Sequence, residues 1–231
     1  MYFSAALAQF PSHHCVGYAT SDTITGPYTA IDRPIVCPDP NGDGTSIVTV
    51  IESSGQGGAI DASGFRDSDG SRYLLYKIDG NSLVAGGACG NDPASGSGMP
   101  TPIMMVQVEE NGLDPVVAPI QLLDRDPAID GPLIEAPSLG LTAPGQYTLF
   151  YSSNCFDSDQ YDITWAYAIS VTGPYTRSGP LLTTGIEGYD APGGGTISKD
   201  GSHFVFHANS PAGRSMFTTT ISGSGTAVQY S

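Results

Sequence analysis

The stretch GAIDASGF (58–65), followed by YLLYKIDG (73–80), decides the fold. An opening segment leads through a turn into an aromatic-rich apolar segment. Two later parts of the chain repeat this order, namely LIEAPSLGL (133–141) with YTLFYSSN (147–154), and APGGGTIS (191–198) with HFVFHANS (203–210). Short apolar runs bounded by turn residues predict strands. A repeated pair of such runs therefore predicts small sheets that recur along the chain.

These recurring sheets indicate an all-β fold of the β-propeller type. The chain has 231 residues with 30 Gly and 18 Pro, and we find no stretch with sustained helical periodicity. The segment GYATSDTITGPYTA (17–30) is echoed by AYAISVTGPYTR (166–177). Radial repetition of small antiparallel sheets, each packed on its neighbours, is the β-propeller arrangement. We predict one propeller domain over residues 1–231.

The repeat also predicts where the blades lie. We assign a partial blade to residues 1–40 and complete blades to about 55–115, 131–178 and 190–225. The segment MYFSAALA (1–8) is similar to the second strand of each repeat. Because propellers typically close with four to eight blades, we expect the propeller to be incomplete at its N-terminus by about one blade and one strand. The alternative is a smaller, open or four-bladed variant.

Composition and charge narrow the classes of partner. The net charge is −15, which disfavours nucleic acid and anionic membrane surfaces and suits a neutral substrate. The four cysteines lack the paired spacing of zinc ligands. Two disulfides in an extracellular, secreted protein are the favoured interpretation, with Cys15 bonded to Cys37, and free buried thiols are the alternative. We expect a monomer.

Two carboxylates in the repeat are the candidate catalytic groups. Asp61 and Glu135 each precede a tyrosine by 12 residues, so we expect them at equivalent positions of inner strands, meeting at the mouth of a central channel. An apolar setting such as that around Glu135 suits a carboxyl group that protonates a leaving group near neutral pH. Asp61 would orient it and hold its proton in place by like-charge repulsion. The alternative is that both residues serve turns or strand ends.

Together these blocks resemble the inner-strand blocks of glycoside hydrolase family 43, in order from residue 1 to about 220. The resemblance implies a five-bladed propeller that hydrolyses arabinose- or xylose-containing plant polysaccharides with inversion. It assigns the general acid to Glu135 and the pKa-modulating aspartate to Asp61. The family's general base, an aspartate on the first strand of the first blade, matches no position here. We therefore expect weak or no hydrolysis, and a non-catalytic carbohydrate-binding propeller is the alternative function.

Weaker signals concern the rim of the site. The resemblance implies that His207 helps to hold a calcium ion or water cluster and that Arg214 faces the sugar; a core histidine and a surface charge are the alternatives. It requires no cofactor beyond that structural calcium. Tyr151, Ser153 and Asn154 end an apolar strand and could bind sugar hydroxyls or, alternatively, cap a turn. An oligo- or polysaccharide is the expected partner.

Overall fold

The chain is described by a computed structural model that covers residues 1–8, 10–37, 58–83, 89–91, 98–224 and 227–231. Regular structure in these residues consists of strands and two 3₁₀ turns, η1 (Gly80–Leu83) and η3 (Ile186–Gly188). The all-β prediction is confirmed. In this part of the chain, no helix has the length and apolar character needed to cross a membrane.

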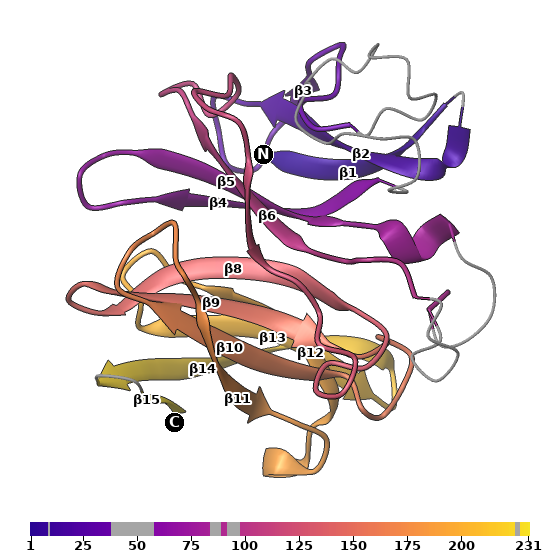
Figure 1. Ribbon diagram of the computed structural model, residues 1–231, viewed down its shortest axis with the longest axis vertical. Coiled ribbons are helices and arrows are strands. Elements are labelled where there is room, and N and C mark those ends of the chain that lie inside the picture. The colour runs from indigo at the N-terminus through magenta and orange to yellow at the C-terminus, as the bar shows by residue number, and fades with distance from the viewer. Residues whose placement is uncertain (9, 38–57, 84–88, 92–97, 225–226) are drawn as a thin grey trace.

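The described strands form four antiparallel sheets (Figure 1). The first is β1 (Tyr2–Leu7), β2 (Phe10–Thr20) and β3 (Thr29–Ala30). The second is β4 (Ala59–Arg66), β5 (Arg72–Ile78), β6 (Ile103–Val108) and β7 (Ile120–Leu123). The third is β8 (Ile134–Ala143), β9 (Gln146–Ser153), β10 (Asp162–Ala168) and β11 (Thr176–Leu182). The fourth is β12 (Asp190–Ile197), β13 (His203–Ser210), β14 (Gly213–Ser224) and β15 (Ala227–Tyr230).

The sheets follow one another as propeller blades do. Each of the last three sheets pairs its strands in chain order, so its first strand lies at one edge. Those first strands meet across the blades, because β4 contacts β8 and β8 contacts β12, while β1 and β2 contact β4 (Figure 1). The propeller prediction is confirmed. The second sheet reaches Leu123 and the fourth reaches Tyr230, both beyond the ends that we expected.

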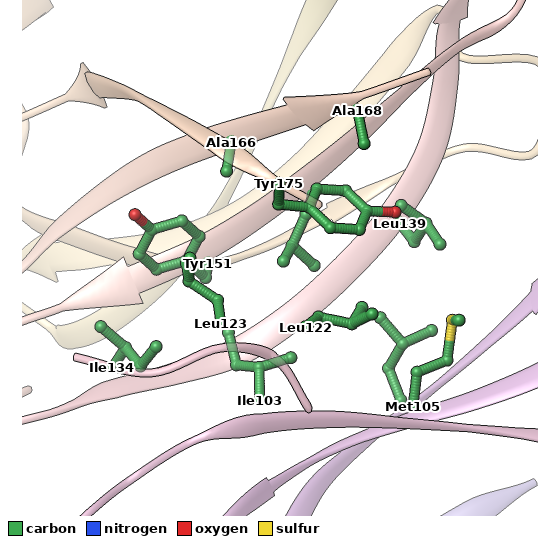
Figure 2. Close-up of a cluster of buried hydrophobic side chains, with 12 residues drawn as sticks. Ile103, Met105, Leu122, Leu123, Ile134, Leu139, Tyr151, Ala166, Ala168 and Tyr175 are labelled. Atoms are coloured by element: carbon green, nitrogen blue, oxygen red, sulfur yellow. The ribbon is translucent and has the colours of Figure 1, made fainter. Parts of the chain in front are cut away.

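Apolar side chains between neighbouring sheets hold the blades together. Figure 2 shows the cluster between the second and third sheets, which contains Ile103, Met105, Leu122, Leu123, Ile134, Leu139, Tyr151, Ala166, Ala168 and Tyr175. Phe150, Trp165 and Phe204 belong to a second cluster, between the third and fourth sheets. Burial of such side chains stabilises by roughly 1.5–3 kcal/mol each. This packing fixes the inner strands relative to one another.

One disulfide closes the first sheet region and the other reinforces a junction between sheets. Cys15 is bonded to Cys37, as expected, and Cys89 is bonded to Cys155. The second bond links the segment before β6 to the residue that follows β9 by two positions. It therefore joins the second sheet covalently to the third.

The first strands of the last three sheets, β4, β8 and β12, are the inner strands of the propeller. Each of them has a β-bulge at the same place in the repeat. The register shifts lie between Ile60 and Ser63, between Glu135 and Ser138, and between Asp190 and Gly193. Inside the bulges, the left-handed backbone falls on Asp61 (φ 57°), Ala136 (φ 54°) and Ala191 (φ 46°). Positive φ is rare for residues other than glycine, and both bulges and such strain concentrate beside active sites.

The bulges correct one expectation. Counted from the register shifts, Asp61 is equivalent to Ala136, and Glu135 is equivalent to Ile60. The two carboxylates are therefore offset by one position of the repeat. The equal spacing to a tyrosine misled because the turns differ: β4 and β5 are joined by residues 67–71, and β8 and β9 by residues 144–145.

Candidate active site

A buried lysine lies beside Glu135. The side chain of Lys77, on β5, is only 1% exposed, and its Nζ is 3.2 Å from Glu135 Oε2 and 3.2 Å from Asp79 Oδ1. Asp79 Oδ2 is in turn 3.2 Å from Nδ1 of His14, on β2. A buried charge is costly unless it is paired, so these carboxylates are what allow the ammonium to stay there. The resulting network runs through the first three sheets.

The lysine keeps its charge despite its burial. Burial lowers the pKa of Lys77, but the negative charges of Glu135, Asp79 and Asp61 outweigh it, so the pKa of Lys77 is raised above its ordinary value. An ammonium that cannot lose its proton at neutral pH acts as a fixed positive charge. It attracts carboxylates from two different blades to one point.

Asp61 reaches the backbone next to Glu135. Its Oδ2 accepts a hydrogen bond of 2.9 Å from the N–H of Ala136, and its own N–H donates to Ser4 Oγ at 3.2 Å. Burial and the charge of Glu135 raise the pKa of Asp61 to about 6, although Lys77 and the Ala136 N–H act in the opposite direction. Asp61 therefore keeps its proton up to about pH 6.

The other oxygen of Glu135 is held by a tyrosine. The hydroxyl of Tyr161 donates to Glu135 Oε1 at 2.9 Å. Burial and the nearby charge of Glu135 raise the pKa of Tyr161, so its hydroxyl keeps the proton that it donates. The Tyr161 ring stacks on His207, with centroids 6.1 Å apart, and the guanidinium carbon of Arg214 lies 5.5 Å from its centroid. The fourth sheet thus also reaches Glu135, through Tyr161.

Two glycines of β12 make room for these rings. A Cβ at Gly193 would overlap Tyr161 Cε1, and a Cβ at Gly194 would overlap His207 Nε2. The N–H of Gly194 donates to Ser152 Oγ at 2.9 Å. Glycine lets backbone approach another group closely. The GGG stretch of the sequence therefore allows the rings of Tyr161 and His207 to pack directly against β12.

The surroundings of His207 do not fit a calcium ion. Its Nδ1 accepts a 2.7 Å hydrogen bond from Arg214 Nε, and burial and Arg214 lower the pKa of His207. Calcium prefers several oxygen ligands, whereas the groups here are a nitrogen and a guanidinium. Among the described residues, the group of potential metal ligands that lies close enough is Cys89, Cys155 and Asp157, and its two cysteines form a disulfide.

Arg214 lies at the exposed side of the Tyr161 ring, but its donors are engaged. Besides His207, it donates to Asn209 Oδ1 at 2.8 Å and to the carbonyl of Ala191 at 2.9 Å. These bonds fix the guanidinium against β12 and β13. A role for Arg214 in binding sugar stays a prediction. In the structure, its guanidinium lies against the ring of Tyr161.

Two of the strand-end residues that we predicted as sugar ligands, Tyr151 and Ser153, lie on the face of β9 opposite to the Glu135 side. Tyr151 is buried in the cluster of Figure 2, Ser153 Oγ donates to Asp162 Oδ1 at 2.8 Å, and the Asn154 amide donates to Ser153 Oγ at 3.2 Å. Ser152 is the residue that pairs with Glu135. Successive strand residues point to opposite faces, so the serine on the Glu135 side is Ser152. The ligand roles of Tyr151, Ser153 and Asn154 stay predictions.

Sequence reasoning missed Lys77 and Tyr161. The signal for Lys77 was present, since it interrupts the apolar run YLLYKI in a chain with eight basic residues. Tyr161 carried no comparable signal, because it lies just before β10, outside the repeated blocks. Only the folded third blade brings its hydroxyl to Glu135.

Asp162 predicts a pH dependence of stability. Burial raises the pKa of Asp162 to about 6, although the Ser153 hydroxyl and N–H oppose this. The folded protein then binds this proton more tightly than the unfolded chain, so the free energy of unfolding falls as pH rises from about 4 through 6. We expect Asp162→Asn to reduce that fall, measured by urea unfolding across this range. Asp61 contributes with the same sign, so part of the slope remains. Equal slopes in the variant and the wild type would contradict this.

The fold and the buried carboxylates of β4 and β8 define a β-propeller protein of the glycoside hydrolase class. The chain belongs to Glycosyl hydrolases family 43, whose sequence profile matches residues 33–223. Comparison with curated protein sequences finds no match.

Similar solved structures share this fold. A thermostable family-43 glycoside hydrolase has a TM-score of 0.74 and 23% identity, over 100% of this chain and 70% of that one. An endo-1,4-beta-xylanase from Bacteroides thetaiotaomicron has a TM-score of 0.67 and 24% identity, with the same coverage. An endo-arabinanase from Bacillus licheniformis has a TM-score of 0.67 and 19% identity, over 99% of this chain and 71% of that one.

Proposed function

We propose that this glycoside hydrolase acts on arabinan- or xylan-type polysaccharides by an inverting mechanism. The observation that carries this proposal is the meeting of Asp61, Glu135 and Lys77 at the junction of β4, β5 and β8. Support for the substrate class comes from family membership and from the xylanase and endo-arabinanase that share the fold.

In this mechanism, Glu135 is the general acid. It gives its proton to the glycosidic oxygen as the bond to the sugar breaks, while Tyr161 and Lys77 hold its two oxygens in place. Asp61 holds the backbone beside Glu135 by accepting the hydrogen bond of the Ala136 N–H, and burial and the charge of Glu135 raise the pKa of Asp61 to about 6.

Inversion also needs a base that activates water. In inverting enzymes this second carboxylate lies about 6.5–9.5 Å from the acid, with room for the water between them. Near Glu135, the carboxylates of the described residues are already bonded: Asp79 to Lys77, and Asp61 to the Ala136 N–H. We therefore propose that this chain hydrolyses its substrate weakly, for want of a free general base.

The same observation favours a second candidate, a carbohydrate-binding propeller without catalysis. Carboxylates that are all paired can still hydrogen-bond sugar hydroxyls, although they leave no group to activate water. In both proposals the partner is a neutral oligo- or polysaccharide, which suits a chain of net charge −15. The two disulfides support an extracellular location. We propose a monomer.

Two measurements on the purified chain separate these functions. The first is hydrolysis of aryl α-L-arabinofuranosides and β-D-xylosides, and the second is calorimetric binding of arabino- and xylo-oligosaccharides. We expect binding, together with turnover at least about 100-fold below the median enzyme rate of about 10 s⁻¹. Binding with no turnover favours the non-catalytic candidate. Turnover at an ordinary enzyme rate contradicts the missing base, and the absence of both binding and turnover overturns the proposal.

A further inference from the structure

We propose that Lys77 is a positioning residue for the general acid, because its buried ammonium holds the Glu135 carboxylate across the junction of the second and third sheets. This inference rests on the proposed function of Glu135. In this role Lys77 does more than stabilise the fold. It fixes the orientation of the Glu135 carboxyl group, with Oε2 toward Lys77 and Oε1 toward Tyr161.

The geometry around Glu135 supports this assignment. Lys77 Nζ is 3.2 Å from Oε2, and the Tyr161 hydroxyl donates to Oε1 at 2.9 Å. The two partners come from different parts of the chain, so together they define the plane of the carboxyl group. The Glu135 side chain is 14% exposed, whereas Lys77 is 1% exposed. The Lys77 ammonium is thus enclosed by protein, while the Glu135 carboxyl group keeps access to solvent.

Around Lys77, acidic groups outnumber the single ammonium. Asp61, Asp79 and Glu135 all act on Lys77, and His14 lies against Asp79. Three carboxyl groups therefore surround one permanent positive charge, and Asp61 is the one whose pKa is raised. Lys77 offsets part of the repulsion between the carboxylates, and it lowers the pKa of Asp61 from the value that burial and Glu135 alone would give.

A structural role alone would not require an ion at this place. Replacing a buried ion pair by well-packed apolar residues is often neutral or stabilising, so burial is weak evidence that a lysine serves stability. An ammonium can instead fix the direction of a carboxylate by hydrogen bonding. The placement of Lys77 on the acid, opposite Tyr161, is what such orientation needs.

The test compares Lys77→Met with Lys77→Arg, which keeps the charge, and with Lys199→Met, which removes an exposed lysine. Hydrolysis is measured on a dinitrophenyl glycoside, whose leaving group departs without protonation, and on an unactivated oligosaccharide. We expect Lys77→Met to lower kcat about 10- to 100-fold on the oligosaccharide and less than about 3-fold on the dinitrophenyl glycoside. Lys77→Arg should recover part of the loss. Lys199→Met should leave both rates unchanged.

A second readout does not depend on turnover. In ¹³C-carboxyl NMR titrations, we expect Lys77→Met to raise the apparent pKa of Asp61 by about one unit above its starting value of about 6, and Lys199→Met to leave it in place. Lys77→Gln, which keeps a hydrogen-bond donor but no charge, replaces Lys77→Met if that variant does not fold.

The outcomes keep the two proposals apart. An equal loss on both substrates means that Lys77 does not act through the acid, and an unmoved Asp61 titration means that its charge does not reach the pair; either result overturns the inference. If the wild-type chain hydrolyses neither substrate, the proposed hydrolysis fails, and the titration alone decides whether Lys77 is coupled to the carboxyl pair.

Discussion

Replacing Glu135 with glutamine is expected to lower hydrolysis of an unactivated arabino- or xylo-oligosaccharide by about 10²- to 10⁴-fold from the wild-type rate. Glutamine has nearly the same shape and can still contact Tyr161, but it has no proton to give to the leaving oxygen. The rate of reducing-sugar release measures the effect. A dinitrophenyl glycoside, which needs no protonation, should lose much less.

The matched control for this change is Glu110→Gln. The side chain of Glu110 is 93% exposed, and its ion-pair contact is with Arg72 at 3.6 Å. We expect that variant to hydrolyse both substrates at the wild-type rate. Oligosaccharide binding by Glu135→Gln should stay within about tenfold of wild type. If Glu135→Gln hydrolyses the oligosaccharide as fast as the control does, Glu135 is not the acid.

Gly193→Ala is expected to lower the free energy of unfolding by about 1–3 kcal/mol, the usual cost of overpacking. The Cβ of the new alanine would overlap the ring of Tyr161. That ring is 2% exposed, so it cannot move aside without losing its packing against β12. Moving that ring also breaks the hydrogen bond from Tyr161 to Glu135. Stability and oligosaccharide hydrolysis should therefore fall together. Urea unfolding and rate measurements on the same preparation check both.

Gly64→Ala is the control for the glycine. Gly64 also lies on an inner strand, β4, but its Cβ would lie 3.3 Å from its nearest neighbour, Tyr2 Cε2. A shift of a few tenths of an ångström accommodates that contact, so we expect a cost of less than about 1 kcal/mol. A Gly193→Ala protein as stable and as active as Gly64→Ala would mean that the Tyr161 ring is not fixed by the inner strand.

Much of the fold could be predicted from the sequence because strand patterns are local. The runs YLLYKIDG and YTLFYSSN show their apolar character without any tertiary information, and their spacing from an acidic opening segment repeats. Packing between blades buries these runs, which is why the pattern and the four-sheet propeller agree. The importance of Asp61 and Glu135 was visible for the same reason, since an isolated charge in an apolar run is conspicuous.

The details of the site could not be predicted in this way, because they depend on single-residue shifts. A bulge inserts one residue into a strand, and one residue reverses which face a side chain occupies. Asp61 and Glu135 are offset by one position because the turns that follow β4 and β8 differ in length, and the register of β8 on β9 places Ser152 rather than Ser153 on the Glu135 side. Tyr161 reaches Glu135 only through tertiary packing, which no local pattern encodes.

The most direct test of the proposed site is a crystal structure of Glu135→Gln with a bound arabino- or xylo-oligosaccharide. The variant removes the acid and preserves the surrounding contacts, so the substrate should remain intact. We predict that a glycosidic oxygen between two sugar units lies within about 3.2 Å of the amide at position 135, the reach of a general acid. A sugar bound elsewhere on the propeller, or no bound sugar at saturating concentration, would contradict the assignment of this carboxylate cluster as a glycan-cleaving site.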